Sequence, residues 1–149
     1  TIGNKGVRKQ QSLIKSVTHA DGTVETPQEG SSTRVIDESV ADQVKNAMES
    51  VAEGYSKVVN VKGYRIAAKT GTAEVAGSDG RLTSIVADFA GMIPADNPRF
   101  AITVIMKDPQ GTYGGMTAGP VFAKIGEFLM QKYNVPTSSP RNDAIAVDW

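Results

Sequence analysis

Two stretches of the chain carry apolar residues three or four positions apart, the spacing that places side chains on one face of a helix. In the first stretch, residues 37–52, Asp37 stands at the start and Gly54 follows the end, as capping preferences favour. The second is a broad apolar stripe that begins near residues 117–120 and stops at Asn134. The pattern therefore predicts two helices, one in the first half of the chain and one near its end.

Alternation of apolar and polar residues fills the region between these helices. It begins at Tyr64 and returns at residues 84–93 and 100–107. The connections are short and rich in residues that favour tight turns. Consecutive strands joined in this way form an antiparallel meander. We therefore predict an α+β fold in which helices cover one face of an antiparallel β-sheet.

Both ends of the chain are more polar than its middle. Near the start, residues 13–18 and 23–25 flank an Asp-Gly pair, which predicts a small hairpin. At the other end, residues 136–149 are polar and contain proline, which predicts a poorly ordered tail. The predicted organisation is one portion of a domain, residues 1–135, followed by this polar tail.

Charge and composition narrow the classes of function. The 149 residues include 16 Lys and Arg against 16 Asp and Glu, so the formal net charge is zero. Nucleic-acid-binding domains normally carry a basic surplus, so we expect no nucleic-acid partner. The chain has no cysteine and one histidine, which excludes disulfides and argues against a structural zinc site. We expect neither a metal nor an organic cofactor.

The motif that indicates chemistry is Lys69-Thr70-Gly71-Thr72, at the end of the first predicted strand of the meander. A strand edge can bind an extended peptide through main-chain hydrogen bonds. Gly71 has no Cβ, so a ligand backbone can come close there. Thr70 and Thr72 offer hydroxyl groups to a carboxylate, and Lys69 supplies a positive charge. The motif therefore indicates a site for the carboxyl end of an extended peptide.

Four blocks of sequence, in the same order, match one family. K-T-G is part of the signature of penicillin-binding proteins and serine β-lactamases. The other blocks are Gly3–Val7, which resembles the end of that family's upstream A-N-G-G segment, the strand and hairpin 89–98, and the approach to the last helix, 118–122. Across residues 3–135 the chain resembles the C-terminal part of the transpeptidase domain of class B, monofunctional penicillin-binding proteins.

This resemblance implies a parent enzyme, a peptidoglycan D,D-transpeptidase that cross-links stem peptides ending in D-Ala-D-Ala through a serine acyl-enzyme. It implies catalytic roles for Lys69 and Thr72, the latter through an oxyanion-binding N–H, and substrate-binding roles for Thr70, Gly71 and Thr72. It also implies covalent inhibition by β-lactams and a place on the extracytoplasmic face of a bacterial membrane. The anchoring helix would belong to the parent, which would serve cell division or cell shape.

The serine nucleophile of the family is the part that the sequence does not supply. Ser12 and Lys15 fit the S-x-x-K pattern, but the surrounding residues predict a strand, in which positions i and i+3 lie ~10 Å apart on opposite faces. The catalytic pair needs a helix instead. No S-x-N tripeptide occurs in the 149 residues. We therefore expect this chain to be inactive alone and to need the upstream part of the domain, as a companion chain or through self-association.

Three other interpretations stay open at this point. A serine β-lactamase or D,D-carboxypeptidase relative shares the strand motif and differs in how water reaches the acyl-enzyme. A non-catalytic module would use the same strand edge to capture a peptide. A purely structural fragment would need the rest of its domain to hold it. Tyr113-Gly114-Gly115 follows the third strand, a position from which it can rim the site, but the favoured interpretation is a plain loop.

Overall fold

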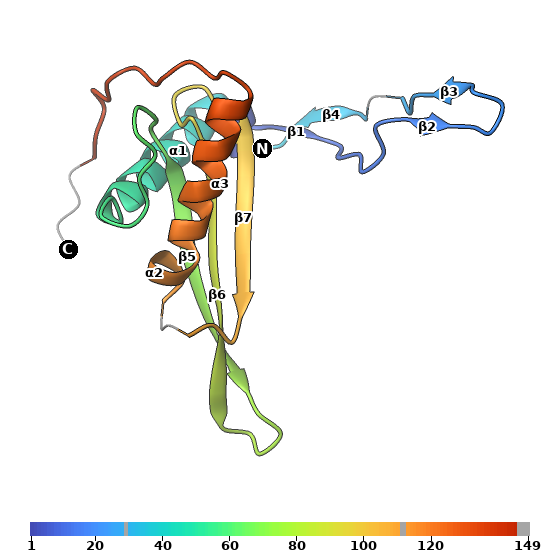
Figure 1. Cartoon of the computed structure of the whole chain (residues 1–149). Coiled ribbons are helices and arrows are strands. Elements are labelled where there is room, and N and C mark those ends of the chain that lie inside the picture. The colour runs from blue at the N-terminus through green and yellow to red at the C-terminus, as the bar shows by residue number, and fades with distance from the viewer. Residues whose placement is uncertain (29, 111–112, 146–149) are drawn as a thin grey trace. The chain divides into compact units, whose positions relative to one another are not determined.

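The computed structural model describes residues 1–28, 30–110 and 113–145 (Figure 1). By its internal contacts the chain forms two compact units, Thr1–Asp42 and Gln43–Trp149. Helix α1, Glu38–Gly54, begins in the first unit and continues into the second. Within the described residues, no helix is both long enough and apolar enough to cross a membrane.

The first unit consists of short elements joined by turns. The predicted hairpin is confirmed, but each of its strands has only two residues, because the preceding residues form no strand. A second antiparallel pair, β1 with β4, was not predicted, since its residues are mostly polar and widely separated in sequence. The elements are η1 (Ile2–Asn4), β1 (Val7–Lys9), β2 (Val17–Thr18), β3 (Val24–Glu25) and β4 (Ser32–Arg34).

The second unit contains the predicted antiparallel meander, with strand order β5-β6-β7. Strand β5 begins three residues later than the alternation predicts, because Tyr64 instead forms a bridge with Val61. A short helix, α2, precedes the last helix and was not predicted. The elements are β5 (Ala67–Ala76), β6 (Leu82–Ile93), β7 (Phe100–Lys107), α2 (Gly114–Thr117) and α3 (Gly119–Lys132).

Helix α3 packs on one face of this sheet and forms the core with it (Figure 1). The rings of Phe89 and Phe122 lie 5.0 Å apart between centroids, and both side chains are fully buried. Along β7, half-buried and exposed residues alternate, so its second face is open to solvent, with Ile105 64% exposed. The predicted α+β fold, with helices on one face of an antiparallel sheet, is confirmed.

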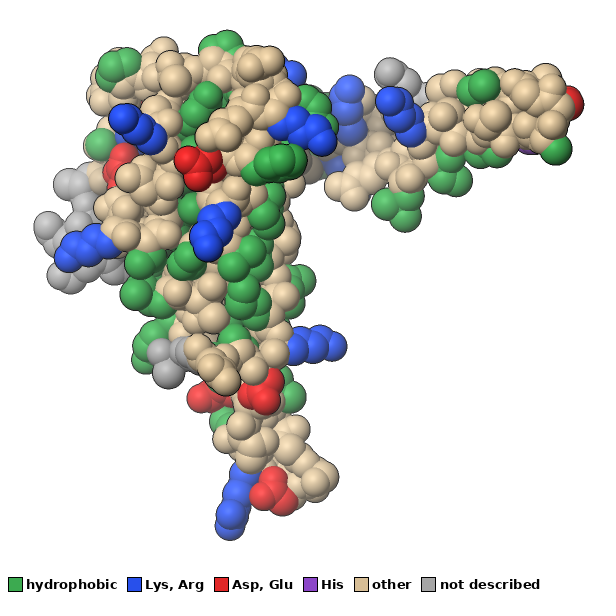
Figure 2. Space-filling view, viewed as in Figure 1, with side chains coloured by type: hydrophobic (Ala, Val, Ile, Leu, Met, Phe, Trp, Pro, Cys, Tyr) green, Lys and Arg blue, Asp and Glu red, His purple; other side chains and the backbone are tan. Residues whose placement is uncertain are grey.

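The β5–β6 hairpin extends beyond the end of β7 (Figure 1). Pairing between β6 and β7 starts at Val86, so Leu82, Ser84 and Ile85 pair with β5 alone, and Thr83 lies at a shift in the register. Exposed charged side chains gather around the tip of this hairpin (Figure 2), including the ion pair between Arg81 and Asp79 at 3.9 Å. The first of the short connections that the sequence predicts within the meander lies at this tip.

Residues 136–145 differ from the poorly ordered tail that the sequence predicts. They form hydrogen bonds with α1, with the segment before β5 and with the β6–β7 connection. Polar composition misleads here because the partners are themselves polar and charged. Residues 146–149 of the predicted tail lie outside the described part of the chain, and the division of the domain at residue 135 stays a prediction.

Candidate functional site

All four residues of the K-T-G-T motif lie in β5, next to one another along its first half. On one side they pair with Ala87–Ala90 of β6. In the part of the chain that the structure describes, no strand pairs with the other side of β5, so this is an edge strand. An edge strand presents unpaired backbone N–H and C=O groups, which an extended peptide can use.

The motif divides between the two faces of the sheet, because side chains alternate along a strand. Thr70 pairs with Phe89, whose ring packs on α3, so Thr70 and Thr72 belong to the helix-covered face. Lys69 and Gly71 therefore belong to the opposite face. The free edge of β5 therefore brings together side chains from both faces of the sheet.

The Lys69 ammonium lies beside the Thr70 hydroxyl. Lys69 Nζ donates a hydrogen bond to the Thr70 carbonyl oxygen at 2.6 Å and lies 3.5 Å from Thr70 Oγ1. Thr70 is half-buried, whereas Lys69 is exposed. A cation and a hydroxyl thus meet at the edge of β5, which is the combination predicted to bind a carboxylate.

Helix α2 docks directly on the motif. The backbone N–H of Gly114 donates to Thr72 Oγ1 at 3.1 Å. A Cβ on Gly114 would lie 2.2 Å from the carbonyl oxygen of Gly71 and 2.3 Å from that of Asp88, so a side chain has no room there. The interpretation of Tyr113-Gly114-Gly115 as a plain loop is therefore wrong for its two glycines, which begin a helix packed on the sheet.

The hydrogen bond from Gly114 also decides how the Thr72 hydroxyl can act. A hydroxyl has one proton to donate and can accept on its lone pairs. Because Thr72 Oγ1 accepts from Gly114, its own proton stays available for a ligand oxygen. The Thr72 side chain is thereby oriented by the protein and still able to donate.

Asp88 is a residue at the site that sequence reasoning missed. It pairs with Gly71 across the strands, and a Cβ on Gly71 would lie 2.3 Å from Asp88 Oδ2. The absence of a side chain at Gly71 therefore makes room for this carboxylate on the face that Lys69 shares. Only the register of β5 against β6 reveals the neighbour, so no sequence motif could have found it.

A pocket of about 410 Å³ adjoins the motif at Thr72. Glu74 follows along β5, and Asp108 and Tyr113 close the pocket from the segment after β7. Tyr113 is 65% exposed, so its ring stands at the rim of the pocket. The motif thus lies at the border of a hollow with a mixed polar and apolar lining, large enough for part of a peptide.

Ser12 is not part of a catalytic pair in this structure. The segment around it is neither the strand that the sequence predicts nor a helix, and Ser12 Oγ donates to the carbonyl oxygen of Ile14 two residues away at 2.8 Å. Its exposed hydroxyl has no lysine held one helical turn away. Among the described residues there is also no group of three His, Cys, Asp or Glu placed to hold a metal ion.

Comparison with known families decides what kind of domain this is. The family model of the penicillin-binding protein transpeptidase domain matches residues 1–127. The chain belongs to this family. The resemblance seen in the K-T-G-T motif and its flanking blocks is confirmed.

Relatives in this family agree in sequence and in structure. Peptidoglycan D,D-transpeptidase FtsI of Escherichia coli is 40% identical over 140 residues, covering 91% of this chain and 22% of that protein. The crystal structure of a peptidoglycan synthetase from Bifidobacterium adolescentis is 66% identical, with a TM-score of 0.87, covering 99% of this chain and 27% of the other. Penicillin-binding protein 3 of Mycobacterium tuberculosis, in complex with ampicillin, is 31% identical with a TM-score of 0.80. The match covers 95% of this chain and 34% of the other. This chain therefore spans between about a fifth and a third of the length of these relatives.

Proposed function

We propose that this chain supplies the K-T-G-T strand of a peptidoglycan D,D-transpeptidase, whose serine nucleophile lies in another part of the domain. The observation that carries the proposal is the position of Lys69–Thr72 on an open strand edge in a chain of the penicillin-binding transpeptidase family. The substrate is a stem peptide that ends in D-Ala-D-Ala, an extended chain with a free carboxylate.

The carboxylate of the stem peptide is bound by the hydroxyls of Thr70 and Thr72, with the Lys69 ammonium beside them. The contact between Gly114 and Thr72 supports this assignment, because it fixes one hydroxyl and leaves its proton to donate. Charge-assisted hydrogen bonds of this kind are roughly twice as strong as neutral ones. The peptide backbone lies along β5 and pairs with its free edge.

Catalysis uses the same strand in two ways. The N–H of Thr72 stabilises the oxyanion that forms when the serine attacks the carbonyl of the penultimate D-Ala; loss of one such donor costs about 2.7–4 kcal/mol in other enzymes. Lys69 keeps the neighbouring hydroxyl and amine groups in their reactive protonation states. Attack releases the terminal D-Ala, and an amine of a second stem peptide then displaces the serine.

The setting of the parent follows from the same family. A relative in complex with ampicillin supports β-lactams as covalent inhibitors of the complete site. Relatives that synthesise peptidoglycan support an extracytoplasmic location on the bacterial membrane, and FtsI among them supports a role in cell division. We also propose that the remaining part of the transpeptidase domain covers the exposed face of the sheet.

A segment exchange tests this function directly. The part of the Bifidobacterium adolescentis protein that aligns with this chain is replaced by residues 1–149, and the chimera is incubated with a fluorescent penicillin. We expect covalent labelling of the chimera, which requires a working K-T-G-T strand. A chimera that is folded, by circular dichroism and thermal melting, and yet takes up no label would refute the proposal.

Matched variants assign the roles within the strand. In the chimera, Lys69→Ala is expected to slow labelling by about 100-fold or more, because it removes the cation of the site. Lys62→Ala, which removes an exposed lysine away from the motif, is the control and is expected to label normally.

The 149-residue chain alone is expected to take up no label. Labelling of the lone chain at Ser12 would contradict the assignment of the nucleophile to another segment. Reversible binding of a D-Ala-D-Ala peptide to the lone chain, weakened by Thr70→Val but without activity of the chimera, would favour the non-catalytic binding module instead.

A further inference from the structure

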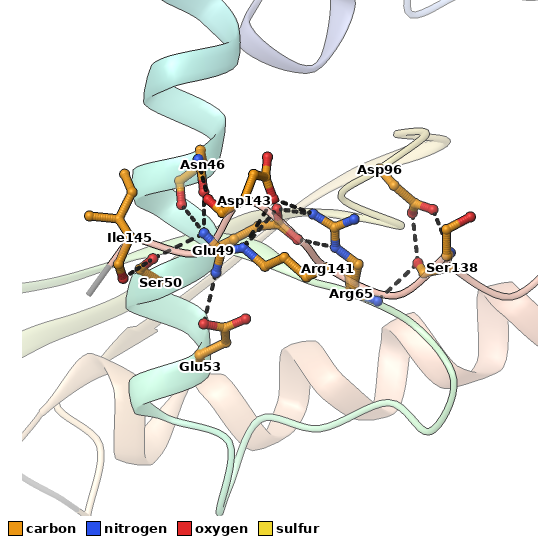
Figure 3. Close-up of polar contacts among 11 residues, drawn as sticks. Asn46, Glu49, Ser50, Glu53, Arg65, Asp96, Ser138, Arg141, Asp143 and Ile145 are labelled. Carbon is orange, nitrogen blue, oxygen red and sulfur yellow. Dashed lines mark hydrogen bonds and ion pairs between the residues drawn. The ribbon is translucent and has the colours of Figure 1, made fainter. Parts of the chain in front are cut away.

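Residues 135–145 follow α3 and form a segment that we call the strap. It runs from the end of α3 to the second half of α1, past the segment that leads into β5 (Figure 3). The strap is fastened by hydrogen bonds at Val135, Ser138, Arg141 and Asp143. It lies beyond residues 1–127, the part that matches the family model.

Arg141 is the most buried charged residue of the strap. Its side chain is 7% exposed and lies among polar groups of α1. Its Nη2 donates to the carbonyl oxygen of Asn46 at 3.0 Å and to Ser50 Oγ at 3.1 Å, and also contacts Asn46 Oδ1. Its other nitrogens lie 2.7 Å from Glu53 and 3.7 Å from Glu49. The hydrogen bonds of Nη2 hold the guanidinium on α1, whereas Nε and Nη1 contribute ion pairs and make no hydrogen bond among the described residues.

Glu49 joins Arg141 to the segment before β5. Its carboxylate is 3% exposed and accepts two hydrogen bonds from Arg65, from Nε at 2.8 Å and from Nη2 at 2.7 Å. These bonds to Glu49 raise the pKa of Arg65 above its ordinary value, although burial opposes the shift. Figure 3 shows Glu49 between the two arginines, with Asp143 near both. One buried carboxylate thus couples the strap to Arg65.

The strap also fixes the backbone just before β5. The N–H of Arg65 donates to Ser138 Oγ at 3.0 Å, and the N–H of Ser138 donates to the carbonyl oxygen of Gly63 at 2.9 Å. The Tyr64 hydroxyl donates to the carbonyl oxygen of Val135 at 2.6 Å. Three consecutive residues before β5 are therefore tied to the strap through backbone and side chain.

The K-T-G-T motif is held by its pairing with β6 and, at Thr72, by helix α2, whereas the side chains of β5 itself add little packing. Around the motif its side chains are small or exposed: Ala67, Ala68, Gly71 and Ala73 contribute no long apolar group. Its far end is held by the hairpin turn, and one of its edges is open. The position of a strand whose side chains make few packing contacts depends on how the two ends of the strand are held.

We propose that the strap positions the K-T-G-T strand and that Arg141 is its central positioning residue. Arg65, fastened by the strap, lies four residues before Lys69, or roughly 13 Å along an extended strand. Any loosening at Arg65 is passed along the backbone to Lys69 and Thr72. The positioning stands on the contacts alone, whereas its consequence for acylation rests on the proposed function.

Amide hydrogen exchange of the 149-residue chain tests the positioning. In Arg141→Gln we expect the amides of residues 67–72 that bond to β6 to exchange roughly 10- to 100-fold faster, because several bonds to a charged group are lost. Amides of α3 around Phe122 are expected to keep their rates. Arg99→Gln, an exposed arginine on the β6–β7 connection, is the matched control and is expected to change neither set.

Two further variants keep the test decisive. Arg141→Lys retains the charge but lacks the guanidinium fork, so we expect an intermediate rate in β5. If Arg141→Gln does not fold, Ser138→Ala removes only the bonds to Arg65 N–H and Asp96 and is expected to accelerate the same amides by a smaller factor. Unchanged β5 amides, or equal acceleration in β5 and α3, would overturn the proposal.

The chimera described above gives the functional readout. With saturating fluorescent penicillin, Arg141→Gln is expected to lower the acylation rate constant about tenfold. The penicillin concentration that gives half the maximal rate should change little, because the misplaced groups of the K-T-G-T strand act mainly in the transition state. Arg141→Lys is expected to recover part of the rate. An unaltered acylation rate constant in Arg141→Gln overturns the proposal. If the chimera that keeps Arg141 takes up no label, that result counts against the proposed function, and the hydrogen-exchange test of the strap remains valid.

Discussion

Replacement of Gly114 by alanine tests how closely helix α2 must approach the K-T-G-T strand. The added Cβ would lie 2.2 Å from the carbonyl oxygen of Gly71 and 2.3 Å from that of Asp88. Real Cβ contacts to oxygen are longer than about 3 Å, so α2 has to retreat by roughly 1 Å. Both atoms that it meets are backbone, so no side chain can swing aside to relieve the contact.

Two losses contribute to the expected destabilisation. Overpacking of a close contact typically costs about 1–3 kcal/mol. The hydrogen bond from Gly114 N–H to Thr72 Oγ1 stretches as α2 moves, which adds about 0.5–1.5 kcal/mol. Together we expect Gly114→Ala to lower the free energy of unfolding by about 2–4 kcal/mol.

Urea unfolding followed by circular dichroism measures this change. Gly126→Ala is the matched control, because Gly126 is also a buried helical glycine, but its Cβ would meet side-chain methyl groups rather than backbone, Ile93 at 3.3 Å and Val61 at 3.5 Å. We expect the control to stay within about 1 kcal/mol of the parent chain, since alanine also favours the helix. A Gly114→Ala chain as stable as the control would refute the close-docking argument.

Two more predictions concern the core and the strap. Phe122→Ala removes a fully buried ring next to Phe89 and is expected to cost about 3–5 kcal/mol in urea unfolding, whereas a loss below about 1 kcal/mol would contradict its place in the core. Burial alone would raise the pKa of Asp96, but hydrogen bonds from Ser138 and Ser139 and the charge of Arg65 outweigh it and lower the pKa below 3.8. Asp96 therefore stabilises the fold above its unfolded pKa, and this contribution disappears as the pH falls through the folded pKa. In Asp96→Asn the free energy of unfolding should therefore fall less steeply between about pH 5 and about pH 3 than in the parent chain. Equal slopes of this free energy against pH in the two chains would contradict the assignment.

The sheet and its helices were predictable because their signals are local. The meander follows from alternation and short turns, and β7 matches the predicted range of 100–107. Helix α3 follows from its apolar stripe, and it begins at Gly119, within the predicted range of 117–120. In each of these elements the residues that define the pattern also make the contacts, so sequence and structure agree.

The features that escaped prediction depend on partners distant in sequence. Helix α2 is only four residues long, too short for a period to show, and it exists because two glycines allow docking on β5 and against Tyr55. Asp88 became a neighbour of Gly71 only through strand register. The contacts of Arg141 with α1 join polar residues that carry no motif. Such features are set by tertiary packing rather than by local preference.

The long sequence separations bridged by the strap have a consequence for the order of folding. The bond between Asn46 and Asp143 closes a loop of 97 residues, whereas the hairpin between Ala76 and Leu82 closes one of a few residues. Loop-closure entropy grows by about 0.6 kcal/mol for each doubling, so the strap contact costs roughly 2–3 kcal/mol more to close than the hairpin. Local pairings form first in chains of this kind. We therefore expect the meander to assemble early and the strap to dock last, so that the folding chain first presents its K-T-G-T strand in an unfastened state.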